Sequence, residues 1–121
     1  MSYSFKGIGE LIVTFAVDDD AELTAGIPVK LSDNGTVIEC DEGDDFIGIV
    51  TSVRGGCAAV QIEGTAEVEC SGTAPDVGYV CLAADGEGGV ADGTGAGDDD
   101  ADIGREYLVL AVDDDVLTIM L

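Results

Sequence analysis

The chain is divided into short apolar runs that end at glycine or aspartate. Leu11 to Val17 stops at three consecutive aspartates, and the runs Phe46 to Val53 and Cys57 to Glu63 flank a Gly-Gly pair. Val, Ile, Thr and aromatic residues dominate these runs, which favours β-strands. Short strands with turns about every 8–12 residues are typical of small all-β proteins. The sequence therefore predicts an all-β fold, a small β-barrel or β-sandwich of about eight to ten short strands.

Local patterns predict the individual strands and turns. Asn34-Gly35 supplies two residues that tolerate positive φ, so we expect a type I′ turn between two strands. Thr65 to Cys70 alternates apolar and acidic residues, as a strand with one face in water does. A short helix is compatible only with Asp76 to Tyr79. The ranges expected to form strands are 11–17, 27–31, 36–40, 46–53, 57–63, 65–70, 79–84, 107–112 and 116–121.

The length of 121 residues fits one domain with one modest core. Residues 1–10 are polar and aromatic with two glycines, so we expect a flexible N-terminal arm followed by a single β-domain over residues 11–121. Residues 85–104 are rich in glycine and acidic residues and cannot bury a core. They predict a long acidic surface loop, broken by a short strand near Gly89 to Ala91.

The charge of the chain excludes one class of partner. Twenty-six acidic residues against four basic ones give a formal net charge of −22. Binding to a phosphate backbone requires clustered Lys and Arg, so direct nucleic-acid binding is not expected. Small soluble domains usually carry a net charge of magnitude about 2–8, so solubility alone does not explain the acidity. Three explanations stay open: high-salt surroundings, a basic docking surface, or multivalent cations held by Asp-rich loops.

The residues needed for catalysis are scarce. The chain has no histidine, which removes the commonest general base, and it carries no nucleophile-elbow, Walker or Rossmann motif. Two carboxylates can hydrolyse a glycoside, but that needs a cleft lined with aromatic rings, and the chain has three Phe, three Tyr and no Trp. We therefore expect a protein that is not an enzyme and has no cofactor.

Acidic clusters and cysteines are the remaining candidates for ligand chemistry. The aspartate triplets fall in turns and match no calcium-loop spacing, so no metal site is predicted. If a cation were bound, Asp98, Asp100 and Asp102 are the ligands that we would name. The four cysteines lack zinc-site spacing and sit in or beside strand-like runs, which favours reduced, buried thiols. One or two disulfides remain the alternative.

No apolar run approaches the ~18 residues of a membrane-spanning helix. The first residues, Met1 to Lys6, lack the apolar centre of a secretion signal. We therefore expect synthesis in the cytoplasm and no membrane partner.

Several segments of the chain carry a resemblance to a known family: Phe5 to Leu11, Leu23 to Leu31 with the Asn34-Gly35 turn, Phe46 to Val50, Ala59 to Gly64, Val77 to Tyr79 and the last two apolar runs. Their order resembles the capsid cement, or head decoration, proteins of tailed bacterial and archaeal viruses. The triple-aspartate turns and residues 85–104 depart from that pattern. The resemblance implies a non-enzymatic protein, typically a trimer, that binds the major capsid protein on the outer surface of the virion and stabilises the capsid.

The N-terminal arm would supply capsid contacts by adding a strand to an exposed sheet edge, because backbone hydrogen bonds give affinity without special side chains. Its candidate contact residues are Tyr3, Phe5, Lys6, Ile8 and Glu10. The alternative function is a free acidic β-domain that binds cations or a carbohydrate through its Asp-rich loops.

Overall fold

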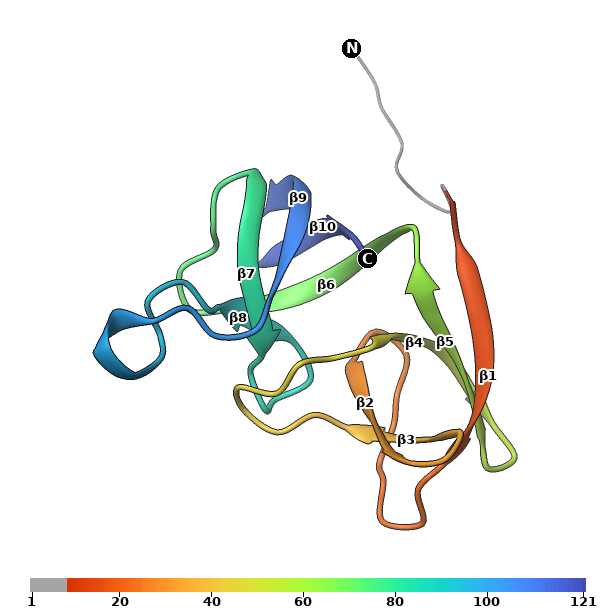
Figure 1. Ribbon diagram of the computed structural model, residues 1–121. Coiled ribbons are helices and arrows are strands. Elements are labelled where there is room, and N and C mark those ends of the chain that lie inside the picture. The colour runs from red at the N-terminus through yellow and green to blue at the C-terminus, as the bar shows by residue number, and fades with distance from the viewer. Residues whose placement is uncertain (1–8) are drawn as a thin grey trace.

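The computed structural model describes residues 9–121, which form ten β-strands in two five-stranded closed barrels that lie side by side (Figure 1). One 3-10 turn, η1 (Asp98–Asp100), lies between β8 and β9. The first barrel consists of β1 (Leu11–Val17), β2 (Pro28–Asp33), β3 (Thr36–Glu39), β4 (Gly48–Arg54) and β5 (Cys57–Glu63). The second consists of β6 (Thr65–Ser71), β7 (Gly78–Ala84), β8 (Val90–Asp92), β9 (Arg105–Asp113) and β10 (Val116–Met120).

The two barrels have the same topology. Around the first barrel the order is β1-β3-β2-β4-β5, and around the second it is β6-β8-β7-β9-β10. In each, the first strand pairs in parallel with the third and antiparallel with the fifth, and every other pair is antiparallel. The parallel contact joins Ala16 to Thr36 in one barrel and Cys70 to Val90 in the other. The chain is therefore a structural tandem repeat.

The predicted all-β class is confirmed, and the strands lie where the apolar runs predicted them. The predicted alternation of the sixth strand is also present, since Glu67 and Glu69 are exposed while Ala66, Val68 and Cys70 are buried. The structure adds the division into two barrels. The hairpins β4–β5 and β9–β10, which look alike in sequence, each close a different barrel.

One of the two hairpin turns predicted from the sequence differs from the structure, and the other is confirmed. Gly35 has φ of +61°, but Asn34 is not in the left-handed region, so the β2–β3 turn has one positive-φ residue where we expected two. A register shift between Leu31 and Asp33 accounts for the difference, because an irregular strand changes the turn that closes the hairpin. In the β4–β5 turn, both Gly55 and Gly56 have positive φ, at +57° and +82°.

Residues 85–104 are more ordered than the composition suggested. They contain β8 and η1, and the segment after β8 is closed where Gly93 O accepts the Ile103 N–H at 2.8 Å. The segment projects from the second barrel (Figure 1). No helix forms at Asp76 to Tyr79, because β7 already begins at Gly78.

The core consists of two clusters, and the larger one draws side chains from both halves of the chain. The first barrel has its own small cluster, which includes Val29, Val37 and Val60. The larger cluster of the second barrel also contains three residues of the first half of the chain, Cys40, Phe46 and Ile49. The segment between β3 and β4 therefore contributes side chains to the core of the other barrel.

Phe46 is the centre of this connection. Its ring, 1% exposed, stacks on the Tyr107 ring with centroids 4.9 Å apart and planes 8° apart. The Tyr107 hydroxyl donates a hydrogen bond to the Phe46 carbonyl at 3.3 Å. Beside it, the Gly43 N–H donates to Ala84 O at 2.8 Å, and the Ala84 N–H donates to Asp44 O at 3.0 Å. We call these contacts the interbarrel joint.

The four cysteines are free thiols. Cys40 and Cys70 are buried, as expected, and Cys81 is partly buried. The expectation of a buried thiol is wrong for Cys57, which is exposed. Cys57 directly follows the Gly55-Gly56 turn at the tip of a hairpin, where the core does not reach.

The β9–β10 turn offers a test of local strain. Asp114 has φ of +54°, a conformation that favours glycine. We expect Asp114→Gly to raise the free energy of unfolding by roughly 1 kcal/mol. Asp19→Gly removes the same charge from a triplet whose residues have negative φ, and should give no gain. Urea denaturation measures both, and equal changes in the two variants would contradict the assignment of strain to Asp114.

The interbarrel joint should contribute strongly to stability. Phe46→Ala removes a fully buried ring and should lower the free energy of unfolding by about 3–5 kcal/mol. Tyr107→Phe removes only the hydrogen bond to the Phe46 carbonyl and should cost about 1 kcal/mol. Tyr79→Phe is the matched control, because Tyr79 is 71% exposed, and should stay within about 0.5 kcal/mol of the parent. Thermal or urea unfolding followed by circular dichroism measures these differences. A Phe46→Ala variant with the same free energy of unfolding as the parent would refute the contribution of the joint to stability.

Candidate binding surfaces

The predicted capsid-contact residues fall at the start of the chain. Tyr3, Phe5, Lys6 and Ile8 lie outside the described residues. Glu10 is exposed and directly precedes β1. The two residues that follow it are apolar and also exposed: 45% of Leu11 and 42% of Ile12 are accessible to solvent.

A row of apolar side chains crosses the outside of the second barrel. Tyr79 on β7 pairs with Leu108 on β9, and Leu108 pairs with Met120 on β10. Directly paired side chains lie on the same face of a sheet about 5 Å apart, so the three form a continuous stripe. Tyr79 is 71% exposed, and Leu108 and Met120 are half-buried. We call these three residues the outer apolar row.

The outer apolar row was not among the sites predicted from the sequence, although the sequence carries a signal for it. Residues 107–112 are apolar at every position, whereas the strand at 65–71 alternates with glutamate on its wet face. A strand with one buried face needs apolar residues only at alternate positions. The additional apolar residues, Leu108 among them, therefore indicate that the outer face of this strand is an interaction surface.

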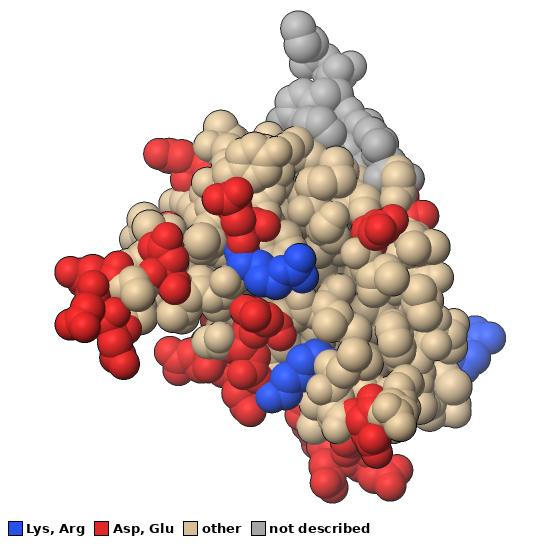
Figure 2. All heavy atoms as spheres, viewed as in Figure 1, with Lys and Arg blue, Asp and Glu red and all other residues tan. Residues whose placement is uncertain are grey.

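Negative charge covers much of the rest of the surface. In Figure 2 acidic side chains gather at the projecting left end and along the lower edge, while the upper part is mainly uncharged. The ion pairs among residues 9–121 are those of Lys30, whose ammonium lies 2.5 Å from Asp44 and 3.4 Å from Asp41. The hydrogen bond from Lys30 lowers the pKa of Asp44, and the same bond raises the pKa of Lys30. No other carboxylate forms a salt bridge with a described residue.

The three aspartates named for a cation do not converge. Asp98 and Asp100 belong to the exposed turn η1, and an oxygen of Asp102 accepts the N–H of Gly95 at 2.8 Å. Over the described part of the chain, no group of three or more His, Cys, Asp or Glu side chains could hold a metal ion. In the same part, no helix is long and apolar enough to cross a membrane.

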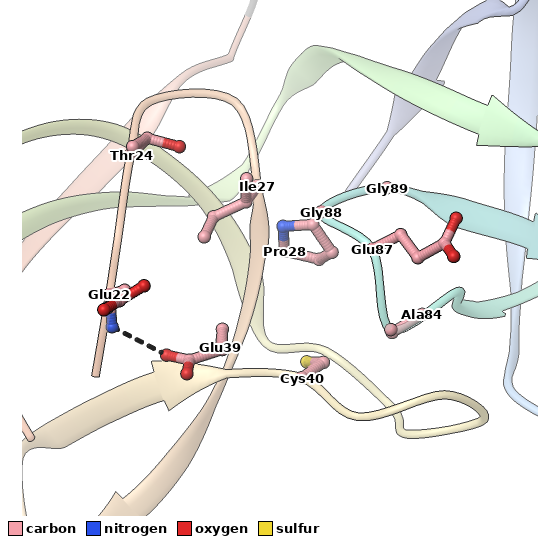
Figure 3. Close-up of a pocket in the computed structure, with 11 residues that line it drawn as sticks. Glu22, Thr24, Ile27, Pro28, Glu39, Cys40, Ala84, Glu87, Gly88 and Gly89 are labelled. Atoms are coloured by element: carbon pink, nitrogen blue, oxygen red, sulfur yellow. Dashed lines mark hydrogen bonds between the residues drawn. The ribbon is translucent and has the colours of Figure 1, made fainter. Parts of the chain in front are cut away.

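A hollow of about 250 Å³ lies where the two barrels meet (Figure 3). Ile27 and Pro28 of the first barrel face Gly88 and Gly89 of the loop before β8. On one side Glu22 and Glu39 approach each other, and the Glu22 N–H donates to a Glu39 oxygen at 3.2 Å. The hollow is open to solvent and combines an apolar floor with acidic walls.

Two further hollows continue from this one. One, of about 470 Å³, shares Thr24, Ile27 and Gly88 with the first and extends to Glu67 and Glu69. The next, of about 300 Å³, shares Glu69 and Val116 with the second and reaches Asp85 and Asp115. Glu87 lines all three hollows. We call the three together the interbarrel groove.

The loop that carries Glu87 is held in place by Asp85. One oxygen of Asp85 accepts the N–H groups of Glu87 and Gly89 at 2.7 and 3.0 Å, and the other accepts the Ser71 hydroxyl at 2.5 Å. Burial tends to raise the pKa of Asp85, but these hydrogen bonds outweigh it and lower the pKa. The carboxylate therefore stays ionised and fixes one wall of the groove.

Comparison with known proteins adds no family assignment. No protein-family model matches the chain, and no curated protein matches it.

The Cys40 thiol, at the edge of the first hollow, is expected to make the free energy of unfolding depend on pH. Burial, reinforced by the nearby charge of Asp44, raises the pKa of Cys40 from 9.0 to about 12. The unfolded chain loses this proton first, so the free energy of unfolding is unaffected by Cys40 below about pH 9 and falls as the pH rises from about 9 towards 12. Urea denaturation at about pH 8 and about pH 10.5 should show the fall.

The control for this effect is another cysteine. Cys40→Ala should reduce the difference in unfolding free energy between the two pH values, whereas Cys57→Ala, which removes an exposed thiol, should leave it as in the parent. An unchanged difference in Cys40→Ala would show that other groups, such as the buried Tyr107 with its raised pKa, cause the whole effect.

Proposed function

We propose that this protein is a structural binding protein that decorates the outer surface of a tailed-virus capsid and stabilises it through contacts with the major capsid protein. The resemblance of the sequence to capsid decoration proteins suggests this function. The described segments that carry the resemblance form consecutive parts of the two barrels, from the approach to β2 through the β9–β10 hairpin.

Closed barrels limit how such a protein can bind. Every strand from β1 to β10 has a neighbour on both sides, so no strand of the described body has an edge that is free along its whole length. Strand addition by residues 1–10 would use an exposed sheet edge of the capsid protein. The body itself would bind mainly through side chains on its outer faces.

The exposed apolar surface of the body is the observation that carries the proposal. The outer apolar row ends at Met120, which pairs with Thr65 at the start of β6. Gly64, the preceding residue, accepts the Leu121 N–H at 2.9 Å, and Glu63 before it pairs with the exposed Leu11. Exposed apolar surface of this kind marks interaction sites. The row and the beginning of β1 thus lie on either side of the buried residues Gly64 and Thr65.

Repetition would provide affinity without a deep site. Many modest contacts within a trimer and over a capsid lattice give an avidity above that of any single contact. The strongly negative remainder of the surface would keep decorated particles apart. Neither role requires a catalytic group.

Co-sedimentation tests the proposal directly. The purified protein should saturate capsids assembled from the major capsid protein of the same genome and raise their temperature of disruption. Deleting residues 1–10 should abolish binding, because the strand-adding segment is lost, while circular dichroism shows the same folded body. Tyr79→Ser should weaken binding at least tenfold, about 1.4 kcal/mol or more, through loss of the outer apolar row.

Leu31→Ser is the matched control. Leu31 is 52% exposed but lies on β2 of the first barrel, so its replacement should leave binding within about twofold, a change below about 0.5 kcal/mol. A folded parent protein that ignores these capsids at every concentration would refute the proposed function. Binding that survives removal of residues 1–10 would refute the role of the arm alone.

A further inference from the structure

We propose that the interbarrel groove binds an extended basic segment of a partner protein, with Lys or Arg head groups against its acidic walls and their aliphatic stems on its apolar floor. This inference is independent of the capsid function, because it rests on the shape and charge of the groove.

The charge of the groove selects a cationic occupant. No lysine or arginine lines any of the three hollows, and none of their carboxylates forms a salt bridge within residues 9–121. The walls therefore carry uncompensated negative charge, which a cationic ligand would neutralise. The carboxylates that line the groove are Glu22, Glu39, Glu67, Glu69, Asp85, Glu87 and Asp115.

The apolar floor of the groove favours a basic peptide over a metal cation as the ligand. Ile27 is half-buried and lines the first two hollows, and Val116 is half-buried and lines the second and third. Lys and Arg lay their methylene stems on such apolar surface while their charged ends reach carboxylates. A metal ion gains nothing from the floor, and the described residues provide no set of three ligands for it.

The shape and origin of the groove favour an extended segment. The first two hollows lie between the barrels and the third continues from them over the second barrel, so successive side chains of one strand-like segment can each occupy one. The walls come from both barrels and from the loop that Asp85 fixes, so the groove is preformed. Preformed sites avoid the cost of ordering on binding.

The negative charge of the groove opposes the binding of other acidic molecules. A second copy of this chain carries the same net charge of −22 and has four basic residues in all. Nucleic acid brings phosphates to a wall of carboxylates, and like charges placed together oppose binding. A basic protein segment is the occupant that satisfies both the walls and the floor.

The probe for this site is a fluorescent peptide of alternating lysine and valine, measured by anisotropy at low and at physiological salt. The parent protein should bind it, with affinity that falls as salt rises, and should not bind the corresponding glutamate–valine peptide. The triple variant Glu39→Gln, Glu69→Gln, Glu87→Gln should bind the lysine peptide at least tenfold more weakly. Glutamine keeps the size of each side chain, so a loss reports on charge.

A matched variant separates the groove from diffuse attraction. Asp98→Asn, Asp99→Asn, Asp100→Asn removes the same number of charges from the exposed η1 turn and should change the affinity less than twofold. Equal losses in the two triple variants would overturn the proposal, since they would show that the peptide follows net charge. Absence of binding to the parent at low salt would also overturn it.

A steric variant tests the shape at constant charge. Thr24 is exposed and lines two of the hollows, so Thr24→Trp should obstruct the groove and weaken peptide binding at least tenfold. Ser32→Trp, on the exposed end of β2, should have no effect. Circular dichroism checks that each variant is folded. Parent-like affinity in folded Thr24→Trp would exclude the groove as the binding site.

Discussion

The stacking of Phe46 on Tyr107 is the contact on which the arrangement of the two barrels depends. Each barrel closes its own ring of strands, so no shared strand joins them. The connection includes side chains from the β3–β4 segment that enter the larger core, backbone hydrogen bonds from Gly43 and to Asp44, and a buried hydrogen bond from the Gln61 amide to Thr65 O at 2.6 Å. Because the groove is lined from both barrels, its shape follows from this joint. Stability and the proposed binding site therefore have a common structural basis.

Closure and acidity together favour binding of the described body through side chains. A closed barrel has no strand whose edge is free along its whole length, and carboxylates at the turns stay in water at little cost. Two apolar surfaces are the candidates for such binding, the outer apolar row and the floor of the interbarrel groove. The first combines the exposed Tyr79 with the half-buried Leu108 and Met120, which suits a broad contact with a large partner. The second is concave and acidic, which suits a narrow basic segment. The two surfaces can thus serve different partners.

Sequence reasoning located the strands because strand formation depends on local patterns. The alternation at Thr65 to Ser71 predicts a strand with one exposed face, and the glycine pair at Gly55 and Gly56 predicts a hairpin turn, without reference to the rest of the chain. Sequence reasoning failed where the structure of a residue depends on neighbours that are distant in the sequence. The β2–β3 turn differs because the strand pairing is irregular before Asp33, and Cys57 is exposed because the core ends below the hairpin tip. Of the predicted site residues, Glu10 lies where an arm was expected, and the three aspartates at 98, 100 and 102 do not converge.

The sequence by itself determined an all-β protein with acidic turns, since residue type and spacing fix secondary structure and surface charge. Only the tertiary structure decided that ten strands make two barrels of one topology, because the parallel pairs β1–β3 and β6–β8 join segments that no local pattern links. It also decided where the binding surfaces lie. The groove brings Glu39 and Glu87 to one cavity from opposite halves of the chain, and such proximity arises only when the barrels pack.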